Sequence, residues 1–96
     1  MRRALWRGVE LAAADRTLCL GGCEYFPPEA VRWEHLLDSP RRAWRWPAGR
    51  VAYLSVSVDD EVVTDIAWYL QRPLPAAYRV HRHVAFAAPV RLAGGQ

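Results

Sequence analysis

Lysine and asparagine are absent from this 96-residue sequence, and all 13 basic residues are arginine. We interpret this bias as the signature of a GC-rich bacterial genome and not as chemistry. No run of 18 apolar residues occurs, which excludes a membrane-spanning helix. The first seven residues carry charge but no apolar run follows them, so we expect no secretory signal and a cytoplasmic location.

Cysteine is scarce, and we expect Cys19 and Cys23 to be free thiols in a reducing compartment. With His81 and His83 they form a formal Cys₂His₂ set. The cysteine spacing is C-x₃-C instead of the C-x₂-C that is typical of zinc sites, so we expect neither a metal nor another cofactor. A glycine-rich phosphate loop and a G-x-S-x-G nucleophile motif are also missing, which argues against a P-loop enzyme and an α/β-hydrolase.

The remaining composition, 52% hydrophobic and 24% charged, is typical of one small globular domain. We assign residues 1–93 to this domain and 94–96 to a frayed tail. Periodicity and turn residues predict a mainly β fold, a small twisted sheet or partly open barrel with one or two short helical turns. Residues 31–37 fit either a strand or a helical turn. The expected short strands are 5–6, 9–13, 17–20, 80–86 and 90–92, with helical turns within 25–31 and 76–79.

The clearest element is a hairpin over residues 51–69, whose first strand alternates apolar and polar side chains. A three-residue turn at 59–61 would pair Leu54 with Ile66 and place Tyr53, Ser55 and Asp65 together on the opposite face. A two-residue turn would instead pair Leu54 with Asp65 and bury a carboxylate among aliphatic side chains. Because that burial is costly, we favour the three-residue turn.

Several short motifs occur in a recognisable order. Residues 25–31 read Y-F-P-x-E-x-V, residues 52–56 read A-Y-L-S-V, residues 65–69 read D-I-A-W-Y, and P-L-P-A-A at 73–77 precedes H-V-A-F at 83–86. On these motifs the chain resembles, essentially end to end, family 427 of the domains of unknown function, which carries a nucleotidyltransferase-type label.

The resemblance implies a β-tent fold, like that of methionine sulfoxide reductase B and of the thalidomide-binding domain of cereblon. Those relatives often hold structural zinc on two C-x-x-C hairpins, which this sequence lacks. The C-P-W-K-G hallmark of the family falls on residues 45–49, where the cysteine and lysine are missing and only Gly49 remains. The family's N-H falls on Cys23 and Glu24, and its glycine before x-V-A-F is Arg82. The chain therefore resembles a divergent member.

Residues 41–46 alternate arginine and tryptophan. On a strand, Arg42, Trp44 and Trp46 would share one face, with Ala43 and Arg45 on the other. We first interpret the segment as an edge strand with solvated arginines and inward tryptophans, then as an aromatic wall for a ligand, and last as a nucleic-acid contact.

Five tryptophans are more than so small a core can hold, so we expect some of them to line a pocket or an interface. The expected ligand-binding residues are Trp44, Trp46, Trp68, Tyr69, Tyr25 and Ser55. The expected catalytic residues are Asp65 and Glu24 as an acid/base pair and Tyr53 as a hydrogen-bond donor, with Tyr69 as the alternative donor. In the alternative interpretation, Asp65 only accepts hydrogen bonds from turn amides and Glu24 is solvated.

These residues predict a domain that binds a small hydrophobic or cyclic molecule in an aromatic pocket. Its catalytic form would be a cofactor-independent cyclase or isomerase of bacterial biosynthesis, acting by proximity and acid/base chemistry. The alternative is a non-catalytic interaction module, for example a homodimer. A weaker alternative is nucleic-acid binding through Arg41, Arg42, Arg45 and Arg50.

Overall fold

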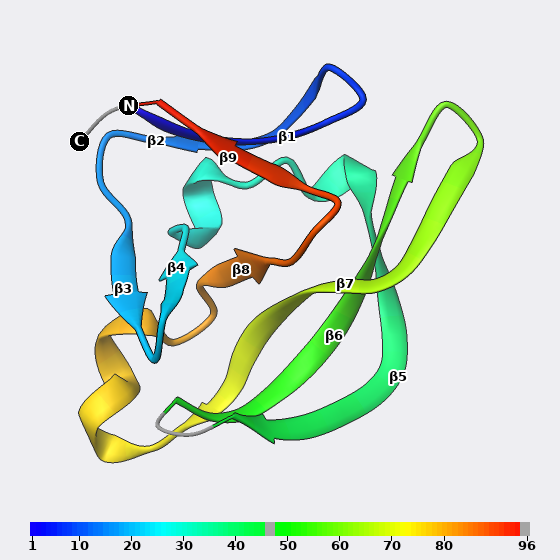
Figure 1. Cartoon of the computed structure of the whole chain (residues 1–96). Coiled ribbons are helices and arrows are strands. Elements are labelled where there is room, and N and C mark those ends of the chain that lie inside the picture. Colours follow the sequence, from blue (N-terminus) through cyan, green and yellow to red (C-terminus); the bar gives the residue numbers. More distant parts are fainter. Residues whose placement is uncertain (46–47, 95–96) are drawn as a thin grey trace.

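The structure, a computed structural model, describes residues 1–45 and 48–94, except for the side chain of Ala76. Its strands form three antiparallel sheets, which we call sheet A (order β2-β1-β9), sheet B (β3-β4) and sheet C (β5-β6-β7-β8), as Figure 1 shows. The strands are β1 (Arg2–Trp6), β2 (Val9–Ala14), β3 (Leu18–Leu20), β4 (Cys23–Tyr25), β5 (Leu36–Arg45), β6 (Gly49–Val58), β7 (Glu61–Pro73), β8 (Val84–Phe86) and β9 (Arg91–Ala93). Short 3-10 turns cover η1 (Pro28–Ala30), η2 (Trp33–His35) and η3 (Pro75–Val80).

The mainly β fold is confirmed, and none of the described sheets closes into a barrel. Three helical turns are present in the described chain where one or two were expected. The ambiguous residues 31–37 contain both alternatives, because η2 is followed directly by β5. The strand expected over 80–86 begins only at Val84, since Val80 ends η3 and Arg82 has a positive φ of 63°. His81 and His83 therefore do not share the face of one strand.

The β6–β7 hairpin corrects the expected three-residue turn. Val58 pairs with Glu61, so the turn holds only Asp59 and Asp60, both at positive φ. Such a pair is the requirement of a type I′ turn, which matches the twist of the strands. If the register set by this turn continued along the hairpin, Leu54 would pair with Asp65 and the carboxylate would be buried. The register shifts instead, and Leu54 pairs with Ala67.

That shift is a bulge in β7. Val56 pairs with Val63 and Leu54 pairs with Ala67, so residues 64–66 of β7 lie opposite the single residue Ser55 of β6. The two extra residues carry Asp65 out of the aliphatic face. The two-residue turn is thus compatible with an apolar core. A register continued without a shift along the hairpin would not have allowed this combination.

A second bulge lies in β5, on the other side of β6. Asp38 pairs with Leu54 and Arg42 with Ala52, so residues 39–41 lie opposite Tyr53. Pro40 is in this bulge, and β5 is an edge strand of sheet C, so both features are places where a strand tolerates proline. The two bulges thus flank adjacent same-face positions of β6, Tyr53 and Ser55.

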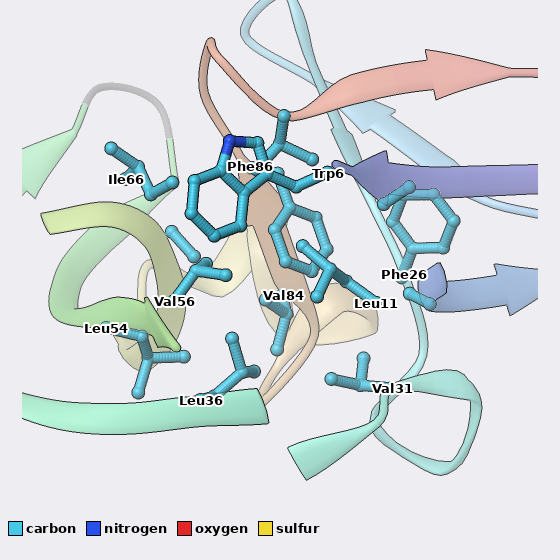
Figure 2. Packing of buried hydrophobic residues seen from close by; sticks show 14 of the residues in the cluster. Trp6, Leu11, Phe26, Val31, Leu36, Leu54, Val56, Ile66, Val84 and Phe86 are labelled. Atoms are coloured by element: carbon cyan, nitrogen blue, oxygen red, sulfur yellow. The ribbon is translucent and has the colours of Figure 1, made fainter. Parts of the chain in front are cut away.

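Both faces of β6 are buried, whereas the sequence predicted only one. Leu54 and Val56 pack into the larger core, which lies between sheets A and C and contains Trp6 and Phe26 (Figure 2). Val51 and Tyr53 pack into a smaller core on the other face, which sheet B and η3 cover. The smaller core consists of Tyr25, Ala48, Val51, Tyr53, Trp68, Leu70, Ala77, Val80 and Ala85.

The two cysteines are free, as predicted. Cys19 pairs with Glu24 and Cys23 pairs with Leu20 across the β3–β4 hairpin, so the two thiols lie on opposite faces of it. The part of the chain that the structure describes has no helix with the length and hydrophobicity of a membrane span.

Candidate functional site

The two bulges border a groove of about 520 Å³ on the Tyr53 and Ser55 face of β6. Residues of β5 line one wall, residues of β7 line the other, and the hydroxyl-bearing Ser55 lies between them. The lining residues are Asp38, Ser39, Pro40, Arg41, Ser55, Thr64 and Asp65. Side chains that carry charge or hydroxyl groups thus dominate the groove.

Asp65 has a left-handed backbone with φ of 57°, and this conformation is held by Ser55. The Ser55 Oγ accepts a hydrogen bond of 3.3 Å from the Asp65 backbone N–H. Ser55 is only 7% exposed, so this contact is the base of the groove. Aspartate is among the few non-glycine residues that tolerate this region, partly because its short side chain can bond locally.

Arg41 crosses from the opposite wall. Its Nη1 lies 3.9 Å from Asp65 Oδ2, and its guanidinium carbon lies 4.7 Å from the centroid of the Tyr53 ring. Tyr53, Ser55 and Asp65, which the alternation placed together, therefore meet around Arg41. They do so through two bulges and not through the regular register that was expected.

The other expected aromatic residues lie below the groove. Trp68 is the cross-strand partner of Tyr53, with ring centroids 6.1 Å apart, and both side chains are buried. The Trp68 Nε1–H donates to the Tyr25 hydroxyl at 3.2 Å, and burial raises the pKa of that phenol. The Arg45 guanidinium carbon lies 3.7 Å from the centroid of the Trp68 ring. These side chains support the groove from the smaller core.

The remaining expected ligand-binding residues are spread over the molecule. Tyr69 packs against the larger core. Trp44 is 69% exposed and shares the face of its partner Arg50, opposite to the face of Ala43. For Trp44 this corrects the expectation of an inward side chain, because Arg45 takes the inward position. Trp46 lies outside the described residues.

Glu24 does not line the groove. Its Oε2 accepts from Arg2 Nε at 2.8 Å and from Thr17 Oγ1 at 2.7 Å, and its Oε1 accepts from Arg2 Nη2 at 2.8 Å. The hydrogen bond from Arg2 is the main cause that lowers the pKa of Glu24, against the opposing effect of burial. Glu24 thus fastens β4 to β1.

Asp38 also lines the groove, and the sequence analysis missed it. It directly precedes the residues that bulge out of β5. The available signal was the Asp-Ser-Pro sequence at 38–40, because a proline within a strand indicates an edge or a bulge.

A smaller cavity of about 220 Å³ lies between β3 and η3. Leu18, Cys19 and Leu20 line it on one side, and Ala77, Arg79 and Val80 on the other. Within residues 1–45 and 48–94, no three His, Cys, Asp or Glu side chains are grouped as a metal site would require. His83 Nδ1 instead lies 3.1 Å from the carbonyl oxygen of His81.

The fold is a small antiparallel β domain with a groove beside the β5 and β7 bulges. A family model described as "Domain of unknown function (DUF427)" matches residues 3–93. The chain belongs to this family, which confirms the resemblance drawn from its motifs. None of the curated proteins compared with the chain matches it.

The retained hallmark glycine has a structural reason. Gly49 begins β6 with φ of 127°, in a region that favours glycine. A Cβ at this position would overlap the Arg72 carbonyl oxygen and lie 2.8 Å from the Leu74 backbone nitrogen. The close approach of β6 to the end of β7 therefore requires a residue without a side chain.

Proposed function

We propose that this domain binds a small polar molecule in the groove between the β5 and β7 bulges. The observation that carries the proposal is the placement of two bulges on either side of β6, which brings the Arg41 and Asp65 side chains together above Ser55. Bulges are enriched next to active sites, where they re-aim side chains. A residue other than glycine held at positive φ is a further feature of functional sites.

The lining chemistry indicates the ligand class. Arg41 can donate to a carboxylate or carbonyl oxygen of the ligand, while Asp38 and Asp65 can accept from its hydroxyl or amino groups. Ser39 and Thr64 can do either. The groove volume falls within the range of small-molecule sites, about 300–1,000 Å³. The charged and hydroxyl-bearing residues of the lining favour a ligand with polar groups of its own, whereas the tryptophan content predicted a hydrophobic one.

The catalytic form of the proposal is a cofactor-independent cyclase or isomerase. Asp65 would act as the base, and Asp38 takes the place of Glu24 as the second carboxylate because it lines the same groove. Tyr53 lies beneath the Arg41 guanidinium and would orient that cation instead of donating a proton to the ligand.

A matched pair of variants tests the binding site. Asp65→Asn removes a groove carboxylate, and Asp60→Asn removes one from the hairpin tip. Both positions have similar positive φ values, 57° and 67°, which asparagine tolerates, so the two variants change charge with equivalent backbone demands. A library of hydroxy acids, amino acids and amino sugars is screened by ligand-observed NMR, and the hits are titrated against ¹⁵N-labelled protein.

We expect hits that shift the Ser55 and Asp65 amide signals and that bind at least tenfold more weakly to Asp65→Asn, with affinity retained in Asp60→Asn. Ligands that bind both variants equally, or a screen without hits, would contradict the proposal. Any hit is then followed for conversion by mass spectrometry, and conversion lost in Asp65→Asn would support the catalytic form.

A further inference from the structure

One row of side chains crosses three strands of sheet C. Trp44 of β5 pairs with Arg50 of β6, and Arg50 pairs with Arg72 of β7. Val51 pairs with Leu70, so the register of β7 shifts by one residue at Gln71. Because directly opposed residues of antiparallel strands share a face, Arg72 lies on the same face as Arg50 and Trp44. We call this set the Trp44 row. It lies near the end of sheet C that is remote from sheet A (Figure 1).

The charges in this row are not compensated within the described chain. Arginines directly opposite each other destabilise a sheet, as Arg50 and Arg72 do here. The described ion pairs use Arg2, Arg3, Arg7, Arg32 and Arg41, and no described carboxylate pairs with Arg50 or Arg72. An unfavourable pair of cations that the fold does not need indicates an anionic partner.

The structure also separates the arginines around the row into two groups. Arg41 and Arg45 lie on the other face, over the rings of Tyr53 and Trp68. Arg42 shares the face of the Trp44 row, but its Nη1 donates to the carbonyl oxygens of Ser39 and Arg41. Arg41 and Arg45 are therefore not available on the face of the Trp44 row. Arg72, which is distant in sequence from the 41–46 segment, provides a cation on that face.

We propose that the Trp44 row binds single-stranded nucleic acid, with one base stacked on the Trp44 indole and phosphates bound by Arg50 and Arg72. Exposed aromatic rings beside cations are the common elements of such surfaces. At 69% exposure, Trp44 projects from the surface and does not enclose a small molecule, which would require a concave site. A paired base is not available for face-on stacking, which favours a single strand over a duplex. The formal net charge of +3 favours the same partner.

The test measures fluorescence anisotropy of a labelled 15-nucleotide oligothymidine at several salt concentrations. We expect Trp44→Ala to weaken binding at least fivefold, the size of the loss of one stacked base. The double variant Arg50→Ala/Arg72→Ala should weaken it at least tenfold. It should also reduce the slope of log K against log salt by about 1.4, because each phosphate contact contributes about 0.7.

Two controls match these variants elsewhere on the surface. Trp33→Ala removes another exposed tryptophan, and Arg91→Ala removes an exposed arginine of β9. Both should bind as the wild type does. The double arginine variant should melt at or above the wild-type temperature, since it relieves a repulsion between like charges.

The proposal would be overturned if the protein did not bind the oligonucleotide, or if the two control variants weakened binding as much as the variants of the row. It would also be overturned if AMP or heparin bound as tightly as the oligonucleotide. A lowered melting temperature that accompanies the loss of binding would assign the row a structural role instead. The groove variant Asp65→Asn should bind the oligonucleotide normally, so this test and that of the groove succeed or fail independently.

Discussion

The Ser55 hydroxyl oxygen accepts a hydrogen bond from the Asp65 backbone N–H at 3.3 Å, and it thereby joins the centre of β6 to the bulge of β7. Ser55 is buried, and the bulge leaves Asp65 without a regular partner in the ladder. The groove geometry therefore depends on a hydroxyl group of the middle strand as well as on its wall residues.

Replacement of Ser55 by alanine should destabilise the protein by about 1–3 kcal/mol, because the Asp65 amide would lose its acceptor in a partly buried place. Ser57→Ala is the matched control, two residues further along the same face of β6, and should change the free energy of unfolding by less than about 0.5 kcal/mol. Urea unfolding followed by tryptophan fluorescence measures both. Equal stability of Ser55→Ala and wild type would mean that the bulge is held by other contacts.

The hallmark glycine offers a second comparison. Gly49→Ala should cost about 2–5 kcal/mol, since the new Cβ meets backbone atoms of Arg72 and Leu74 at an unfavourable φ. Gly22→Ala meets no atom within 4 Å and bears only the φ penalty of about 1–2 kcal/mol. Thermal unfolding of the two variants should rank Gly49→Ala as clearly less stable, and the reverse order would contradict the close approach of β6 and β7.

The bond between Arg2 and Glu24 predicts a dependence of stability on pH. Arg2 lowers the pKa of Glu24 below its ordinary value of 4.5, so the folded state favours the ionised carboxylate. The resulting stabilisation is fully present above about pH 4.5 and is lost as the pH falls through the lowered pKa. Glu24→Gln should therefore be less stable than wild type at pH 7, with a difference that shrinks in acid.

Urea unfolding at intervals from pH 7 to pH 2.5 measures this difference. Glu34→Gln, which replaces an exposed glutamate without a described ion pair, serves as the control and should follow the wild-type curve. A gap between wild type and Glu24→Gln that stays constant over the whole range would argue against a role of the Glu24 charge.

The sequence predicted the β class and the shared face of Tyr53 and Ser55, because alternation along a strand directly reports which side chains share a face. It also grouped Asp65 with them, but through a register that the structure does not have. It predicted the wrong turn because it assumed a continuous register from the tip of the hairpin. The bulge of β7 makes a two-residue turn compatible with an apolar core. It does not change the alternation of side chains along β6, so the sequence of β6 does not indicate it.

The Asp-Ser-Pro sequence indicated a bulge near Asp38, but local patterns could not place Asp38 or Arg72 beside its neighbours from other strands. Asp38 reaches the groove because β5 bulges opposite Tyr53, and Arg72 joins the Trp44 row because β7 lies next to β6 there. The partner of Glu24 likewise comes from β1, more than twenty residues earlier in the chain. Contacts of this kind depend on strand order, which the spacing of residues does not encode.

The pairing of β1 with β9 has a consequence for the order in which the fold is completed. Arg3 pairs with Ala93, and Ala4 with Leu92, so β1, the middle strand of sheet A, receives its second neighbour only when β9 has left the ribosome. The β6–β7 hairpin, with its two-residue turn, needs no such wait, because closing a short loop costs little entropy. The β6–β7 hairpin can thus form during synthesis, whereas the sheet next to Trp6 stays incomplete until β9 has been made.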